Sequence, residues 1–177
     1  MKMGFSVDSQ EGETMADTWT DINQLFALLA GTWTGEGRGE YPTVQSFDYR
    51  ETLIFTRRDD KSLAYEQRTH KRYDGQTEWL VSHWENGFIR MLENGDLELV
   101  NAQSGGRSEV LIGTGEISGS LFRIQFNSKL VINDPRMICT ARTFELEGET
   151  LRYQVEMQTT AVDRLTHHLT ISLQRVK

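Results

Sequence analysis

The sequence predicts an all-β protein: an antiparallel up-and-down β-barrel of about ten strands, preceded by one short helix. Glycines alternate with other residues in 31–39, apolar residues alternate in several later runs, and hairpin-type turns separate those runs. A period of two is typical of strands, and only two prolines interrupt the chain. So many hairpin-linked strands would expose sheet edges unless the sheet closed, which favours a barrel over a sandwich.

The first ordered element is expected to be a short helix. Residues 1–18 are polar and acidic without periodicity, so we interpret them as a flexible leader to a domain of residues 19–177. Asp21 is suited to cap a helix that carries Leu25, Leu28 and Leu29 on one side, and Gly31 is placed to end it.

The next stretch, residues 31–43, reads GTWTGEGRGEYPT and is the most unusual in the chain. Gly35, Gly37 and Gly39 leave one face of the predicted strand without side chains. A neighbouring backbone, a bulged bend or a ligand would each fill that space, and the sequence leaves the three alternatives open. The spacing is neither GxGxxG nor a P-loop, and Tyr41-Pro42 would break a following helix, so nucleotide binding is disfavoured.

Ten further runs follow and read as strands, separated by Gly, Asn and Asp. Tight turns are predicted at Asp74-Gly75, 94–96, 118–120 and 147–149, and a long irregular turn at 127–136. The predicted runs are 46–56, 62–73, 77–85, 87–92, 97–103, 107–114, 121–128, 137–147, 150–160 and 165–176. A barrel of this size is wider than its own side chains readily fill, so we expect an internal cavity for a small ligand.

Composition narrows the functional classes. The formal net charge is −7 with both signs interleaved, which disfavours nucleic acid or an anionic membrane as a partner. The only cysteine, Cys139, cannot pair within the chain, and there is neither a signal-peptide layout nor an apolar run of membrane-spanning length. We therefore expect a cytoplasmic protein.

Several motifs resemble those of the nitrobindins, small heme-binding β-barrels similar in shape to fatty-acid-binding proteins and lipocalins. The first is the glycine-rich stretch at 31–43, and the resemblance covers roughly residues 25–177. The later motifs, in chain order, are HWENGFIR at 83–90, AQSG at 102–105, RTFEL at 142–146, MQTT at 157–160 and LTHHL at 165–169.

The resemblance implies a ferric heme b protein that binds nitric oxide and isomerises peroxynitrite to nitrate. It also implies that His168 is the catalytic residue and the proximal iron ligand, since imidazole is a strong ligand for heme iron. The alternation itself favours His167, which has the parity of Leu165 and Leu169. Only one of the two histidines can point inward on a regular strand, so both remain candidates, and a bulge near 161–164 would reconcile the spacing.

Four further residues are candidates for heme binding. The resemblance places His83 on the opposite side of the ligand; alternatively it bonds a backbone carbonyl, with Glu85 and Arg90 as surface partners. The resemblance also implies that Thr43 contacts heme, that Gln103 faces the cavity and that Arg136 lies close to the heme carboxylates. The hydroxyl of Thr43 would equally suit a turn cap.

A second function from another class stays open, namely a non-catalytic carrier of a fatty acid or another apolar small molecule. In either case the expected partner is a small molecule, and self-association into a homodimer is left open. A hemin titration distinguishes the two functions.

Overall fold

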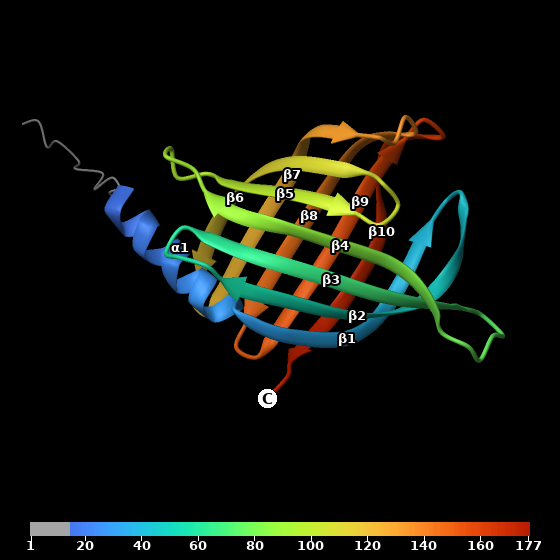
Figure 1. The fold of residues 1–177 in the computed structure, drawn as a ribbon, viewed down its shortest axis with the longest axis horizontal. Coiled ribbons are helices and arrows are strands. Elements are labelled where there is room, and N and C mark those ends of the chain that lie inside the picture. Colours follow the sequence, from blue (N-terminus) through green and yellow to red (C-terminus); the bar gives the residue numbers. More distant parts are fainter. Residues whose placement is uncertain (1–14) are drawn as a thin grey trace, which may run out of the picture.

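The computed structural model describes residues 15–177, with side chains from residue 22 onward. Ten antiparallel strands close into one barrel in which each strand pairs with its neighbours in sequence and β1 pairs with β10 (Figure 1). The predicted fold class is therefore confirmed. The elements are α1 (Met15–Leu29), β1 (Gly31–Tyr41), β2 (Val44–Arg57), β3 (Ser62–Tyr73), β4 (Leu80–Met91), β5 (Leu97–Gln103), β6 (Ser108–Ser118), β7 (Leu121–Ile132), β8 (Met137–Glu147), β9 (Thr150–Thr159) and β10 (Val162–Arg175).

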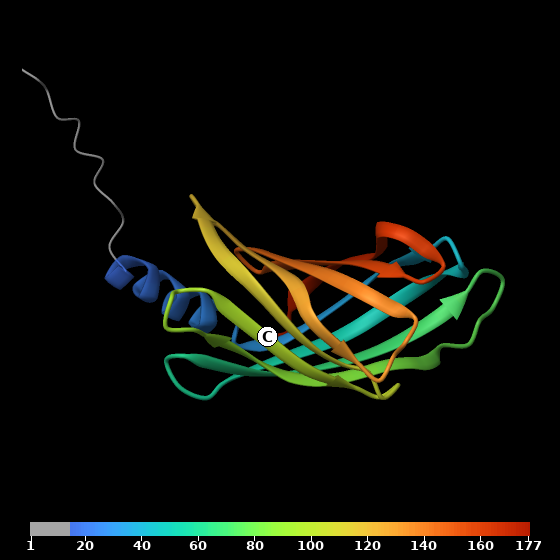
Figure 2. The same ribbon diagram turned by 90° about the horizontal axis from the view of Figure 1, so that it is seen from above.

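Helix α1 covers one end of the barrel, which we call the closed end (Figures 1 and 2). Because successive strands run in opposite directions, the turns β1–β2, β3–β4, β5–β6, β7–β8 and β9–β10 gather at the other end, the open end. Within residues 15–177 no helix has the length and apolarity needed to cross a membrane.

The start of the helix differs from the prediction. The helix begins at Met15, so Asp21 lies inside it and does not cap it. Residues 15–21 contain neither glycine nor proline, so nothing in them stops the helix from extending. Residues 1–14 of the predicted leader lie outside the described residues, whereas 15–18 belong to α1.

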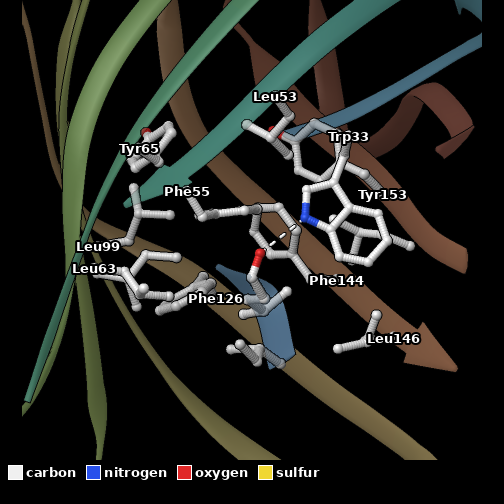
Figure 3. Close-up of a cluster of buried hydrophobic side chains, with 14 of the residues drawn as sticks. Trp33, Leu53, Phe55, Leu63, Tyr65, Leu99, Phe126, Phe144, Leu146 and Tyr153 are labelled. Carbon is white, nitrogen blue, oxygen red and sulfur yellow. Dashed lines mark hydrogen bonds between the residues drawn. The ribbon is translucent and has the colours of Figure 1, made fainter. Parts of the chain in front are cut away.

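The closed end holds a packed apolar core (Figure 3). Ile22, Leu25, Phe26 and Leu29 of α1 are buried at helical spacing, while Leu28, predicted on the same side, is exposed. Trp33 is completely buried, and its indole nitrogen donates a hydrogen bond of 2.8 Å to the Leu29 carbonyl. This bond satisfies one carbonyl at the end of the helix and fixes α1 to β1.

The space over the β1 glycines is filled by the neighbouring strand. A Cβ atom built at Gly35 would lie 2.1 Å from the Ser172 carbonyl oxygen, and one at Gly37 would lie 2.3 Å from that of Thr170. Both oxygens belong to the backbone of β10. Of the three alternatives for these two positions, the structure therefore supports the close approach of a neighbouring backbone.

Strand bounds differ from the predicted runs at several places, and two predicted interruptions of strands were wrong. The runs 77–85 and 87–92 form one strand, β4, which passes through Gly87. A side chain at Gly87 would collide with the Val100 carbonyl oxygen at 2.2 Å and with the Tyr65 ring at 2.6 Å, so this glycine allows close packing and does not end the strand. The irregular turn predicted at 127–136 is confined to 133–136, because β7 continues to Ile132.

The tight turns predicted at 94–96, 118–120 and 147–149 are confirmed, whereas Asp74-Gly75 begins a longer connection, 74–79, between β3 and β4. Gly75, Gly95, Gly119 and Gly148 all have positive φ, between 57° and 87°, as hairpin turns of this kind require.

Candidate functional site

A cavity of about 310 Å³ opens at the open end of the barrel. Its deepest residues are buried and polar, and apolar side chains form much of the remaining wall. The polar residues at depth are Tyr49, Gln67, Glu85, Arg142 and Tyr153; the apolar wall includes Val44, Phe47, Val155, Met157 and Leu169; and the more accessible polar lining includes Lys71, Tyr73, His83, Arg107 and His168.

A β-bulge decides which of the tandem histidines faces this cavity. Between β9 and β10, His167 pairs with Glu156 and Leu169 pairs with Val155, so His168 is an extra residue without a partner of its own. His168 and Leu169 consequently both line the cavity, whereas His167 is exposed. A second irregularity, between Val162 and Thr166, overlaps the segment 161–164 in which a bulge would reconcile the spacing.

The His168 ring is held in one orientation. Its Nδ1 lies 3.3 Å from the carbonyl oxygen of Glu40, and the rings of Tyr41 and Phe47 pack edge-on against it at centroid distances of 5.8 and 6.3 Å. Burial lowers the pKa of His168 to about 4, so the ring is neutral at pH 7. With the Nδ1 proton donated to the carbonyl, Nε2 keeps its lone pair, as a metal ligand requires.

The glycine strand positions this histidine. A Cβ atom at Gly39 would lie 2.2 Å from Cζ of Phe47, so only glycine lets that ring lie where it contacts His168. The next residue, Glu40, supplies the carbonyl that orients the imidazole. Space at Gly39 is thus filled by a side chain that belongs to the site.

His83 also lines the cavity, and its surroundings differ from the alternative in which it bonds a backbone carbonyl and has Glu85 and Arg90 as surface partners. Its Nε2 lies 3.3 Å from Oε2 of Glu85, which is fully buried and therefore no surface partner. Arg90 lies on the outside of the barrel and bonds Glu98 at 2.6 Å. The Thr69 hydroxyl bonds both the backbone nitrogen and the carbonyl of His83.

Beneath the histidines lies a buried ionic network centred on Arg142. Its guanidinium contacts Glu85 at 2.5 and 3.0 Å and Glu109 at 2.5 Å. Burial alone would raise the pKa of Glu85, but the charge of Arg142 holds it well below its usual range. The sequence carried one signal of this network: Arg142 has the parity of the buried Phe144 and Leu146.

The remaining predicted residues lie at the open end but do not line the cavity. Thr43 is in the β1–β2 turn. Gln103 is buried and accepts a bond of 2.9 Å from Nε of Arg107, which does line the cavity. Arg136 is 82% exposed in its side chain and pairs with Asp134 at 3.3 Å. Their roles toward heme stay predictions.

Sequence reasoning also missed Lys71 and Arg107 as cations of the cavity lining. Lys71 belongs to a basic cluster typical of a solvated strand end, yet it lines the cavity, with Nζ 5.1 Å from the Tyr73 ring centroid and 5.7 Å from that of Phe47. Strand register, which brings residue 71 opposite Tyr49, is what turns it toward the cavity.

These features define a hollow barrel for a prosthetic group or small ligand. An oriented, neutral imidazole can supply one protein ligand to a metal whose other ligands come from a prosthetic group. The apolar wall with nearby cations is suited to a flat apolar group that carries acidic substituents. A metalloporphyrin has these properties, so the residues present fit heme.

Comparison with known proteins agrees with this class. Residues 23–175 match the family model described as "THAP4-like, heme-binding beta-barrel domain", and the chain belongs to this family. The match confirms the resemblance found in the motifs and identifies heme as the cofactor.

Relatives match over most of their length. "Peroxynitrite isomerase 1" of Mycolicibacterium paratuberculosis is 36% identical over 144 residues, covering 78% of this chain and 87% of the relative. "Peroxynitrite isomerase" of Nocardia farcinica is 35% identical over 158 residues, covering 88% and 90%. The crystal structure of Rv2717c from M. tuberculosis is 28% identical, with a TM-score of 0.76, and covers 87% of this chain and 96% of that one.

Proposed function

We propose that this protein is a heme b-dependent isomerase that converts peroxynitrite to nitrate, with His168 as the iron ligand. The observation that carries the proposal is the His168 ring, a neutral imidazole on the cavity wall whose Nδ1 is engaged by the Glu40 carbonyl. The names of the relatives support the choice of reaction.

The chain's contribution is to bind and orient the heme. Phe47, Met157 and Leu169 form part of the apolar wall. Lys71 and Arg107 line the same cavity and can pair with the heme carboxylates. The predicted contributions of Thr43, Gln103 and Arg136 from the same end remain part of the proposal. Ferric heme, when bound, supplies a Lewis-acidic iron that promotes cleavage of the peroxynitrite O–O bond.

We assign His83 the task of hydrogen bonding to the substrate. Its Nε2 approaches the buried carboxylate of Glu85, which in turn is held by Arg142. A carboxylate at that distance favours the tautomer with the proton on Nε2, which leaves Nδ1 as the ring nitrogen available to a ligand at the cavity wall.

Two further expectations belong to this proposal, nitric oxide binding at the same iron and a cytoplasmic location, and the proposal leaves self-association into a homodimer open. Gel filtration at several concentrations tests self-association, and nitric oxide titration of the heme-loaded protein tests the first expectation.

The carrier alternative is less well supported. A fatty acid needs a long apolar tunnel, but the depth of this cavity is lined by Glu85 and Arg142, and the closed half of the barrel is filled by apolar side chains.

Hemin titration tests the proposal. The wild type is expected to develop a Soret band and to accelerate peroxynitrite decay in stopped-flow measurements, and His168→Ala is expected to lose both. His167→Ala is the matched control, one residue away and exposed, and should behave as wild type. A His168→Ala protein that binds hemin with wild-type affinity and spectrum would refute the assignment.

A further inference from the structure

The polar interior below the cavity contains three buried carboxyl groups, and one of them lacks a cationic partner among the described residues. Arg142 contacts Glu85 and Glu109, and Arg107 approaches Glu109 at 3.5 Å. Each of those two carboxylates therefore has a cationic partner. Glu51 is 3% exposed and lies in the same interior, yet among the described residues it has no ion-pair partner.

The surroundings of Glu51 are asymmetric. Its Oε2 accepts a very short hydrogen bond from the Tyr49 hydroxyl, whereas its Oε1 is buried and has no hydrogen-bond partner within the described part of the chain. On the adjacent strands it lies opposite Gly35 of β1 and Thr69 of β3, neither of which carries a charge. The charged or titratable groups that interact with it are Tyr49 on β2, Glu85 on β4, Arg142 on β8 and Tyr153 on β9.

An unpaired buried carboxylate is strongly destabilising, and a carboxyl group in this position lowers that cost by taking up a proton. In agreement, burial raises the pKa of Glu51 to about 7, and the side chains of Tyr49 and Gln67 limit the rise. Paired Glu85 has its pKa shifted in the opposite direction.

We propose that Glu51 is a proton store beneath the cavity, and that its protonation decides whether the Tyr49 hydroxyl donates a hydrogen bond into the cavity or only accepts one. Tyr49 lines the cavity, whereas Glu51 lies behind it, so Glu51 acts as a positioning residue through Tyr49.

The switch needs a single proton. When Glu51 is ionised, the only hydroxyl proton of Tyr49 points to Oε2, and the phenol oxygen is left as an acceptor, which Gln67 already contacts from 3.5 Å. When Glu51 is protonated on Oε2, its own hydroxyl donates to the phenol oxygen. The Tyr49 proton is then free to rotate toward the cavity and donate to an oxygen atom there.

The consequence for ligands rests on the proposed function. A neutral Glu51 with a donating Tyr49 favours an oxygen anion such as peroxynitrite, and an ionised Glu51 with an accepting Tyr49 opposes it. The cavity would thus lose preference for oxygen anions as the pH rises through 7.

Infrared spectroscopy of the heme-free protein tests the switch without relying on the heme proposal. The carbonyl stretch of a buried protonated carboxyl group is separate from carboxylate bands. It should be present at pH 5.5, disappear with a midpoint near 7, and be absent from Glu51→Gln. The wild-type titration needs no variant: the absence of any such band would overturn the proposal.

The tyrosine C–O stretch provides the second readout, because it distinguishes a donating from an accepting phenol. In the difference spectrum between wild type and Tyr49→Phe, recorded with ring-labelled tyrosine, this band should move with the same midpoint as the carboxyl band. Glu98→Gln, on the outer face, is the control and should leave both bands unchanged. A tyrosine band that stays fixed while the carboxyl group titrates would place the proton on Oε1 and rule out the switch.

Discussion

Replacing Glu51 with glutamine should stabilise the heme-free protein at high pH and have little effect at low pH. Glutamine keeps the shape of a protonated glutamate but cannot ionise. In the unfolded chain Glu51 loses its proton near pH 4.5, whereas in the folded barrel it keeps the proton until about pH 7. Proton binding by Glu51 in the folded barrel therefore stabilises the wild type. This stabilisation is complete below pH 4.5 and is lost as the pH rises through 7.

The size of the effect follows from the pKa change. Raising the pKa from 4.5 to about 7 corresponds to roughly 3 kcal/mol, at about 1.4 kcal/mol for each pH unit. The free energy of unfolding of Glu51→Gln minus that of wild type should thus increase by about this amount between pH 4.5 and pH 8.

The wild type alone would hide this dependence, because His168 acts with the opposite sign. Its pKa falls from 6.5 to about 4 on folding, so unfolding takes up a proton between pH 4 and 6.5, and stability rises with pH in that window. Stability of the wild type should be nearly level there, whereas Glu51→Gln should show the His168 slope alone.

Urea unfolding followed by tryptophan fluorescence at pH 5, 6, 7 and 8 measures both curves, since Trp33 is fully buried in the folded protein. A difference between Glu51→Gln and wild type that stays constant over this range would refute the claim that Glu51 is neutral in the folded barrel.

Three further substitutions test other parts of the account. Gly39→Ala should displace the Phe47 ring, lower the free energy of unfolding by roughly 1–3 kcal/mol and weaken hemin binding. Gly105→Ala, where a built Cβ atom meets nothing within 4 Å, is the control and should have none of these effects; equal behaviour of the two variants in urea unfolding and hemin titration would contradict the packing argument. Arg142→Met removes the cation that contacts both Glu85 and Glu109 and should cost roughly 3–5 kcal/mol at pH 7, less in acid. A loss under about 1 kcal/mol in urea unfolding would show that the network is not ionic. Lys71→Ala should raise the dissociation constant for hemin and leave that for hemin dimethyl ester unchanged, and an equal effect on both in absorption titrations would exclude a carboxylate contact.

The architecture was predictable because it is set by local signals. Alternation and turn glycines specify ten antiparallel strands, and closure follows from the need to cover edges. Local signals did not distinguish a glycine that forms a turn from a glycine that allows close packing within a strand. Gly75 ends a strand with positive φ, whereas Gly87 lies within a strand because the Tyr65 ring occupies its side-chain space. That ring comes from another strand, which the local sequence does not indicate.

The site was predictable in part. Period-two parity pointed to His167, and only a bulge, whose position depends on pairing with β9, brings His168 to the cavity. The buried network was missed for a related reason. Glu51, Glu85 and Arg142 each have inward parity, but the barrel brings together strands that are distant in sequence, and parity does not say which inward groups meet.

Iron-edge anomalous diffraction from crystals of the heme-loaded protein tests the central claim most directly. We expect one iron peak per chain within coordination distance of His168 Nε2, with Nδ1 of the same ring still facing the Glu40 carbonyl. An iron atom bound instead by His83 or His167, or heme bound outside the cavity, would contradict the account.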